Sequence, residues 1–535
     1  MKIPGALALA FSVTWFCKPS TENSKPNYAK IFPHISITDK QKKPKPLLDL
    51  HSSSELNAFI FDENHTFKSP KNTILIFVDT LRRDFITPEL APHLSKFIKE
   101  STFVPHSSYS GSTTTHYSTY SVFYGRHAYL RDLTLLNKWD KGSIFLNILK
   151  QGGYKINLYG SPWQYCFDSS NFYDSPDFLH NYAQSNLQSI YGLKMSNLID
   201  FCYQHGPGEM NQQLNPETIP QAIDADGEVV FHQAYRDHQV TSDLIAALPA
   251  MGKEKNFVFY YLFGVHDPYS WLDQGLDDHH GQKLKSEDLF PIDIPNLPWK
   301  SYFSTPADKI SHKTDYINSY KNAIRSVDYE INRLFEALKA QDAWQDTAIA
   351  FISDHGELLF AQQLYDSTYN GRVTHCCKVF EENTNVPIIY HLPGTSSLSP
   401  PFGSHLDIFP SLFAYLGYNF PSSFNRIVQG RPISENNRTC AISFDPRGDP
   451  MSTTFTVHTA SGKLTGILDG ISPQKTRGFY ISSLWDKNDK ADLAFTTTNL
   501  LSERAAIATK WLAKEDISLC IDELFGSTSV ISIDK

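Results

Sequence analysis

Short apolar runs recur along the chain from residue 71 onward, separated by amphipathic stretches. Apolar residues at steps of three, four and seven from Ile317 to Leu338 predict one long helix. Shorter helices are predicted over Leu94–Ile98 and in SIFLNILKQGG. Alternating strands and helices predict an α/β fold, with a mostly parallel central sheet covered by helices on both faces. The predicted strands are Thr73–Val78, Lys155–Tyr159, Asn256–Phe263, Thr347–Ile352 and Val386–Tyr390.

The hydrophobic pattern changes before this region, at one stretch within it, and after it. Residues 18–70 are rich in Lys, Ser, Pro and Asn and show little periodicity, which is typical of a linker or strap. Residues 200–230 are polar and rich in Gly and Pro, and predict a surface insertion. TFTVHTASGKLTGILDG predicts a hairpin, and a final helix is expected over Leu501–Leu512. We therefore expect a main domain over 71–430 and a small C-terminal antiparallel α+β subdomain over 431–535.

The first 17 residues contain an uncharged stretch after Lys2, with the length of a signal-peptide hydrophobic region. A cleaved signal is favoured over a weak anchor, and an ordinary buried segment is the alternative. We therefore expect export, to the periplasm, the medium or the outer face of a membrane, with peripheral membrane contact. The seven cysteines include no CxxC pair, so no zinc module is indicated, while one or two disulfides stay open. The net charge of −9 argues against nucleic-acid binding.

Carboxylates and imidazoles follow three of the predicted strands. Asp79 follows the first strand, and the pair Asp354–His355 follows TAIAFI. His266, followed by Asp267, comes shortly after NFVFYYLF. The carboxyl ends of parallel strands meet at one edge of the sheet, where ligands bind. Oxygen and imidazole donors suit one divalent ion, either Mn, Zn, Ca or Mg, although each residue alone also fits a cap, a turn or a buried hydrogen bond.

A run of hydroxyl side chains, SYSGSTTTHYSTYSVFYG, begins at Ser108 and predicts a short helix. A hydroxyl at a helix N-terminus lies at the positive end of the dipole, which suits a phosphate-like anion. A nearby metal would activate the same hydroxyl as a nucleophile. The alternative is a flexible Ser/Thr-rich cap, and local chemistry does not choose among Ser112, Thr113, Thr114 and Thr115.

Six segments between residues 72 and 420 together resemble one known family. They are NTILIFVDTLRRDF, YGRHAY, FYYLFGVHDPY, DYINSYKNAIRSVDYEINRLFEAL with DTAIAFISDHGE, CKVFEENTNVPIIYHLPG, and SHLDIFPSLFAYLGY. In order and spacing they resemble the sulfatase-like branch of the alkaline phosphatase superfamily. Its nucleophile stands ten residues before the Gly of the Gly-Arg pair, which here is Gly125, so the resemblance implies Thr115.

The resemblance also implies roles for other residues. Asp79, Thr115, Asp354 and His355 would surround one metal ion, and His266 would contact the substrate or act on the leaving group, for example as its proton donor. Contacts to the transferred group or substrate would come from His375, Lys378 and His405. The substrate would be a small-molecule or lipid head-group ester, and the oligomeric state stays open.

This chain departs from true sulfatases at the nucleophile. It reads Thr115-His116-Tyr117-Ser118-Thr119, without the modifiable Cys or Ser, the Pro and the Arg of that family. The Thr nucleophile instead resembles phosphoethanolamine transferases and lipoteichoic acid synthases, so a phosphate ester is favoured over a sulfate ester. The hydroxyl-rich segment also resembles inner-membrane sulfatase-like proteins. An inactive sulfatase fold that binds lipid or an anionic ligand is therefore the alternative to an enzyme.

Overall fold

The computed structural model describes the parts of the chain that carry most of the predicted α/β pattern. Residues 1–17, the helix over 501–512 and most of the insertion at 200–230 lie outside the described residues. The described residues are 34–37, 53–69, 71–131, 142–160, 221–223, 229–231, 233–251, 255–266, 269, 289–293, 312–360, 373–375, 379–435, 438–449, 452–460, 462–469, 478–486 and 531–533.

A five-stranded sheet forms the centre of the fold, in the order β11-β8-β2-β7-β4. Three pairings are parallel, and only the edge strand β11 runs antiparallel, next to β8. The mostly parallel sheet that the apolar runs predict is therefore confirmed. The strands are β2 (Asn72–Val78), β4 (Lys155–Tyr159), β7 (Asn256–Leu262), β8 (Thr347–Ser353) and β11 (Ile388–His391).

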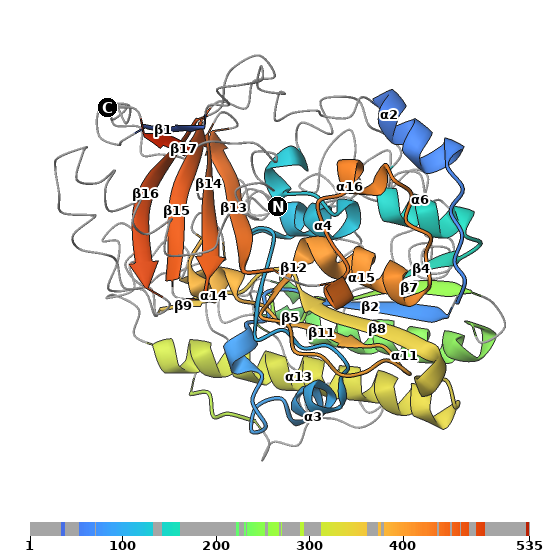
Figure 1. Cartoon of the computed structure of the whole chain (residues 1–535). Coiled ribbons are helices and arrows are strands. Elements are labelled where there is room, and N and C mark those ends of the chain that lie inside the picture. Colours follow the sequence, from blue (N-terminus) through green and yellow to red (C-terminus); the bar gives the residue numbers. More distant parts are fainter. Residues whose placement is uncertain are drawn as a thin grey trace, which may run out of the picture.

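Helices cover both faces of this sheet (Figure 1). In the view shown, α3 and α13 lie below the sheet, while α4, α6 and α15 lie above it. The helix predicted over Ile317–Leu338 is α13, which extends a few residues further at each end. The helices are α3 (Pro92–Glu100), α4 (Thr115–Tyr124), α6 (Ile144–Gln151), α11 (Gln233–Met251), α13 (Lys313–Ala340) and α15 (Ile408–Tyr415).

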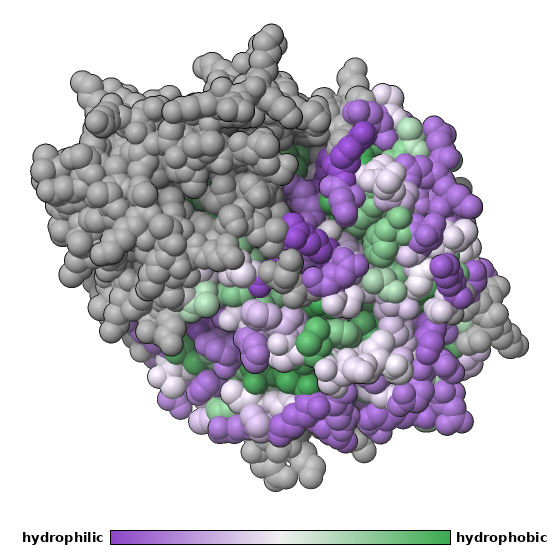
Figure 2. All heavy atoms as spheres, in the orientation of Figure 1, coloured by the Kyte–Doolittle hydropathy of each residue, from purple (hydrophilic) through white to green (hydrophobic). Residues whose placement is uncertain are grey.

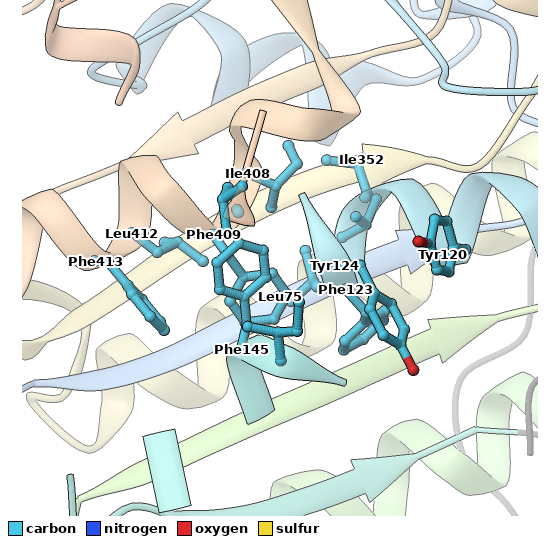
Figure 3. Packing of buried hydrophobic residues seen from close by; sticks show 14 of the residues in the cluster. Leu75, Tyr120, Phe123, Tyr124, Phe145, Ile352, Ile408, Phe409, Leu412 and Phe413 are labelled. Carbon is cyan, nitrogen blue, oxygen red and sulfur yellow. The ribbon is translucent and has the colours of Figure 1, made fainter. Parts of the chain in front are cut away.

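Alternation along β2 divides the core into two clusters. Leu75 and Phe77 face the cluster that α4, α6 and α15 complete, whereas Ile74 and Ile76 face the cluster of α3, α11 and α13. Figure 3 shows aromatic side chains of the first cluster over Leu75, and the rings of Phe145 and Phe409 stack with centroids 4.8 Å apart. Burial on both faces explains why these strands are continuously apolar.

A second, six-stranded sheet carries the predicted C-terminal hairpin, with β14 antiparallel to β15. The N-terminal strand β1, within the range expected to be a linker, pairs with β16 and β17 of this sheet. Its strands are β13 (Cys440–Asp449), β14 (Ser452–Thr459), β15 (Gly462–Asp469), β16 (Gly478–Asp486), β1 (His34–Ile37) and β17 (Ile531–Ile533).

Smaller elements connect these layers. Two short pairings are antiparallel, β5 (Gln221–Ile223) with β6 (Val229–Phe231) and β9 (Leu358–Leu359) with β10 (Val373–Thr374). A third pairing, β3 with β12, is parallel. The remaining elements are α2 (Ser53–Asn57), the π-helix Ala58–Asp62, β3 (Ser107–Tyr109), α14 (Glu381–Thr384), β12 (Phe402–Ser404) and α16 (Phe424–Ile427).

The surface of the described residues is largely hydrophilic. On the face drawn in Figure 2, hydrophilic side chains surround small hydrophobic groups. Phe61 and Leu398 are the exposed large hydrophobic side chains within the described ranges. Across those same ranges, no helix combines the length and apolar character needed to span a bilayer.

Candidate metal and nucleophile site

The strand order brings the two predicted aspartates together. Because β2 lies between β7 and β8, Val78 pairs with both Leu262 and Ser353. Asp79 and Asp354, the residues that directly follow β2 and β8, therefore lie at the same edge of the sheet. The Asp354 N–H donates to the Val78 carbonyl at 3.3 Å, and the Asp79 N–H donates to the Leu262 carbonyl at 3.0 Å.

Asp79, Asp354 and His355 form a buried cluster. One ligand atom from each lies within 4.8 Å of the others, and all three residues are fully buried. His355 Nε2 lies 3.3 Å from Asp354 Oδ2 and 3.9 Å from Asp79 Oδ1. Two buried carboxylates at this separation repel each other unless a cation lies between them.

The main chain orients the ring of His355. Its Nδ1 lies 3.0 Å from the Gly356 carbonyl oxygen, an acceptor, so Nδ1 carries the proton and Nε2 keeps its lone pair. A Cβ on Gly356 would collide with the Glu382 carbonyl oxygen, which explains the glycine that follows the histidine. This outer hydrogen bond is the usual support of a metal-binding imidazole.

Thr115 is the first residue of α4, and its Oγ1 lies 3.3 Å from His355 Nε2. The hydroxyl is thus at the positive end of the helix and beside the buried cluster. Of the hydroxyl residues that precede it, Ser112, Thr113 and Thr114 keep buried oxygens without a hydrogen-bond partner in the described part of the chain. At its other end α4 stops at Gly125, whose φ of 60° is left-handed.

His375 lies between the cluster and His266. Its ring stacks on His355, with centroids 4.7 Å apart, and lies 4.9 Å from the ring of His266. His375 Nδ1 is 3.2 Å from Glu357 Oε2, a carboxylate whose pKa burial raises to about 8. Glu357 was not among the predicted site residues, although it follows the Asp-His-Gly motif directly. Lys378 and Asp267 lie outside the described residues.

His405 is fully buried and both ring nitrogens bind the main chain. Nε2 donates to the Ser353 carbonyl at 2.8 Å, and Nδ1 accepts the Gly111 N–H at 3.2 Å. Burial lowers the pKa of His405 to about 4, so the ring is neutral near pH 7. The ring thereby joins the end of β8 to the segment before the nucleophile, and a substrate contact stays a prediction.

Thr80 connects the three strand ends and was not predicted as a site residue. Its N–H donates to Asp354 Oδ1 at 3.0 Å, and its hydroxyl donates to the Val265 carbonyl at 2.6 Å. The Tyr320 hydroxyl donates to the Thr80 carbonyl at 2.7 Å. Thr80 has φ 55°, a conformation costly for a β-branched residue and typical of functional sites.

A carboxylate from α11 shapes the loop that carries His266. Asp237, which is buried, accepts the N–H groups of Phe263 at 3.0 Å and of Gly264 at 2.7 Å. The His266 N–H closes the turn by donating to the Phe263 carbonyl at 3.0 Å, and its ring stacks on that of Phe263. No motif in the sequence links Asp237 to His266, because the contact joins a helix to a distant loop.

A divalent cation fits this donor set. Asp79 and Asp354 supply oxygens, His355 supplies a nitrogen lone pair, and the Thr115 hydroxyl lies beside them. This is the oxygen-rich mixture with one imidazole that hard and borderline divalent ions accept. The donor set does not distinguish among the ions that the sequence predicts.

A buried acidic cluster and a hydroxyl at the carboxyl edge of a mostly parallel sheet are what the alkaline phosphatase-like class of α/β proteins is expected to have. Within that class the chain belongs to the sulfatase family, whose model matches residues 71–418 of the 535. The resemblance on which the sequence analysis relied is therefore confirmed.

Individual relatives are distant. An endo-4-O-sulfatase of Bacteroides thetaiotaomicron is 24% identical over 243 residues, which are 43% of this chain and 42% of that protein. The chain thus matches less than half the length of that relative. Two phosphonate monoester hydrolases have the same fold. The Silicibacter pomeroyi enzyme has a TM-score of 0.52 at 16% identity, covering 83% of this chain and 95% of its own. The Agrobacterium radiobacter enzyme has a TM-score of 0.51 at 14% identity, covering 85% and 96%.

Proposed function

We propose that this protein is an exported, metal-dependent hydrolase or transferase that acts on a phosphate ester through Thr115. The distance of 3.3 Å between Thr115 Oγ1 and His355 Nε2 carries this proposal. It puts a hydroxyl at a helix N-terminus next to three buried ligand groups. A threonine that only capped the helix would not need to lie beside these three ligand groups.

The chemistry follows from these positions. Thr115 Oγ1 bonds to phosphorus as the hydroxyl releases its proton to water, and the bond from phosphorus to the alcohol leaving group breaks. His266 donates a proton to the departing oxygen. Water or an acceptor alcohol then releases the phosphoryl group from Thr115. A divalent ion held by Asp79, Asp354 and His355, when bound, supplies positive charge for the phosphoryl oxygens and lowers the pKa of the hydroxyl.

The nucleophile supports a phosphate over a sulfate ester. The aldehyde hydrate used by true sulfatases is made from Cys or Ser, and the chain has Thr115 there, with Tyr117 where Pro would stand. An unmodified threonine forms a covalent ester with phosphorus that water can later cleave. A small phosphomonoester, a phosphodiester or a lipid head group fits this chemistry.

The cysteine chemistry supports export. Cys440, buried at the start of β13, is disulfide-bonded. Stable disulfides form mainly in oxidising compartments such as the periplasm or the extracellular space. Together with the apolar first 17 residues, this favours a site of action outside the cytoplasm.

The test is a substrate panel with two isosteric variants of α4. Phosphomonoesters, phosphodiesters, a phospholipid head-group ester and sulfate esters are assayed with Mn, Zn, Ca or Mg. Thr115→Val removes the proposed nucleophile, and Thr119→Val removes a buried hydroxyl without a hydrogen-bond partner in the described structure. We expect Thr115→Val to lose at least about a thousandfold in rate and Thr119→Val to stay near wild type.

Other outcomes would change the assignment. Turnover of sulfate esters alone would overturn the choice of phosphate, and equal activity of the two variants would overturn the role of Thr115. Binding of an anionic lipid or phosphate without turnover of any ester would instead establish the inactive binding protein. The absence of a matching sulfatase Arg keeps that alternative open.

A further inference from the structure

Each carboxylate in the cluster has one of its two oxygens occupied by the protein. Asp354 Oδ1 accepts the N–H groups of Thr80 at 3.0 Å and of His355 at 2.7 Å. Asp79 Oδ2 accepts the hydroxyl of Tyr261 at 2.5 Å. One oxygen of each aspartate, Oδ2 of Asp354 and Oδ1 of Asp79, therefore remains directed at His355 Nε2.

This arrangement limits the number of protein donors. Counting one oxygen from each aspartate, Nε2 of His355 and Oγ1 of Thr115, the described residues offer four donors. The Thr80 hydroxyl is directed at the Val265 carbonyl, to which it donates. Calcium takes six to eight oxygens and commonly binds carboxylates through both oxygens, whereas smaller divalent ions accept fewer, one-oxygen carboxylate contacts.

Tyr261 is held rigidly where it meets Asp79. It lies on β7 directly opposite Phe77 of β2, and the two rings stack with centroids 5.2 Å apart. Tyr261 is 1% exposed. Because side chains alternate along a strand, Phe77 and Asp79 lie on the same face, which brings the Asp79 carboxylate to the Tyr261 hydroxyl. A ring packed in this way cannot follow a rotation of the carboxylate.

We propose that Tyr261 is a positioning residue that restricts Asp79 to one metal-binding oxygen and so makes the site select a small divalent ion over calcium. The inference rests on the metal site of the proposed function and adds its selectivity. Tyr261 acts only through Asp79. Outer hydrogen bonds to ligand residues typically change metal affinity 10- to 100-fold.

Two neighbouring tyrosines of β7 provide a matched experiment. Tyr261→Phe removes the hydroxyl bonded to Asp79 and keeps the ring. Tyr260→Phe removes a hydroxyl that pairs with Thr241 Oγ1 at 2.5 Å, on the opposite face of the strand. Full-length wild-type and variant proteins are freed of metal with a chelator and titrated calorimetrically with Mn²⁺ and with Ca²⁺. Both ions accept oxygen ligands, so their comparison reports size and ligand number.

We expect wild type to bind Mn²⁺ at least about 100-fold more tightly than Ca²⁺. Tyr261→Phe should weaken Mn²⁺ binding about 10- to 100-fold. It should also lower the ratio of Mn²⁺ affinity to Ca²⁺ affinity about tenfold, because Asp79 can then turn both oxygens toward the metal site. Tyr260→Phe should keep the wild-type ratio. Metal-free Tyr261→Phe and Tyr260→Phe should have similar melting temperatures.

Four results would overturn the inference. A wild-type protein that binds Ca²⁺ as tightly as Mn²⁺, or a Tyr261→Phe variant with the wild-type ratio, would refute the selectivity while leaving the metal site intact. A metal-free Tyr261→Phe far less stable than Tyr260→Phe would assign the hydroxyl to the fold instead. Wild type that binds neither ion would remove the proposed function itself, and this inference with it.

Discussion

His405 donates from Nε2 to the carbonyl oxygen of Ser353, at 2.8 Å, on the residue directly before Asp354. The other nitrogen accepts the N–H of Gly111, four residues before Thr115. One neutral imidazole thus spans the two segments that carry the metal ligands and the nucleophile. It can do so only while one nitrogen accepts and the other donates.

The first prediction concerns acid. The pKa of His405 is lowered by burial from 6.5 to about 4. Between these two pH values the histidine therefore binds a proton in the unfolded chain but not in the folded protein. Stability should therefore fall as the pH falls from about 6.5 to about 4, by at most about 3 kcal/mol. Unfolding by urea at a series of pH values measures this slope. His405→Gln should flatten it, whereas replacement of the exposed His312 by Gln should leave it unchanged.

The second prediction concerns metal removal. A chelator should lower the melting temperature of the wild-type protein, because an ion that binds only the folded state stabilises it by mass action. Asp354→Asn keeps the shape of the side chain but removes the negative charge, so its melting temperature should not respond to chelator or added ion. The exposed Asp346→Asn, at the other end of β8, should respond like wild type. A wild-type protein indifferent to both treatments would contradict the metal site.

The third prediction concerns the loop that carries His266. Asp237→Asn leaves one acceptor oxygen for the two N–H groups of Phe263 and Gly264, so the turn before His266 should loosen. We expect kcat to fall about tenfold, with metal affinity unchanged, since no proposed ligand moves. Asp243→Asn, an exposed change on the same helix, is the control. A parallel loss of metal affinity would show that Asp237 supports the whole edge of the sheet rather than His266.

The fourth prediction concerns the contact of α14 with the second sheet, which Glu381 makes with His458 of β14 and Lys463 of β15. Burial alone would raise the pKa of Glu381, but His458, whose Nδ1 lies 3.6 Å from Oε2, and the charge of Lys463 lower it to about 2. Its ionised form therefore stabilises the fold above about pH 4.5, and this contribution is lost as the pH falls toward 2. Glu381→Gln should cost about 3 kcal/mol at pH 7. Glu336→Gln, which breaks an exposed ion pair with Lys339, should cost under about 0.5 kcal/mol. Equal costs for the two variants would contradict a stabilising contact between Glu381 and the second sheet.

Local pattern was enough to predict the strands and where they end. Each central strand is a continuous apolar run because helices bury both faces, and the polar residue that stops the run marks the edge of the sheet. Asp79, Asp354 and His355 could therefore be predicted as neighbours before any coordinates. Thr115 needed the family resemblance as well, since Ser112, Thr113 and Thr114 have the same chemistry.

The partners of those residues depend on contacts between distant parts of the chain. Tyr261 and Asp79 are 182 positions apart, and only the register of β2 with β7 selects Tyr261 rather than Tyr260. A substrate contact by His405 stays a prediction, and packing of α15 against β8 places its ring between two backbone segments. Likewise, β1 lies in a polar stretch with no periodicity, and pairing with β16 and β17 makes it a strand.

The sequence alone determined the class of fold, the edge of the sheet that carries the chemistry and the identities of the proposed ligands, because these follow from local apolar runs and the residues that end them. Only the tertiary structure decided which oxygen of each aspartate accepts hydrogen bonds from the protein, which tautomer His355 adopts and what holds the loop of His266. Those properties come from hydrogen bonds whose two partners meet only after the strands have aligned.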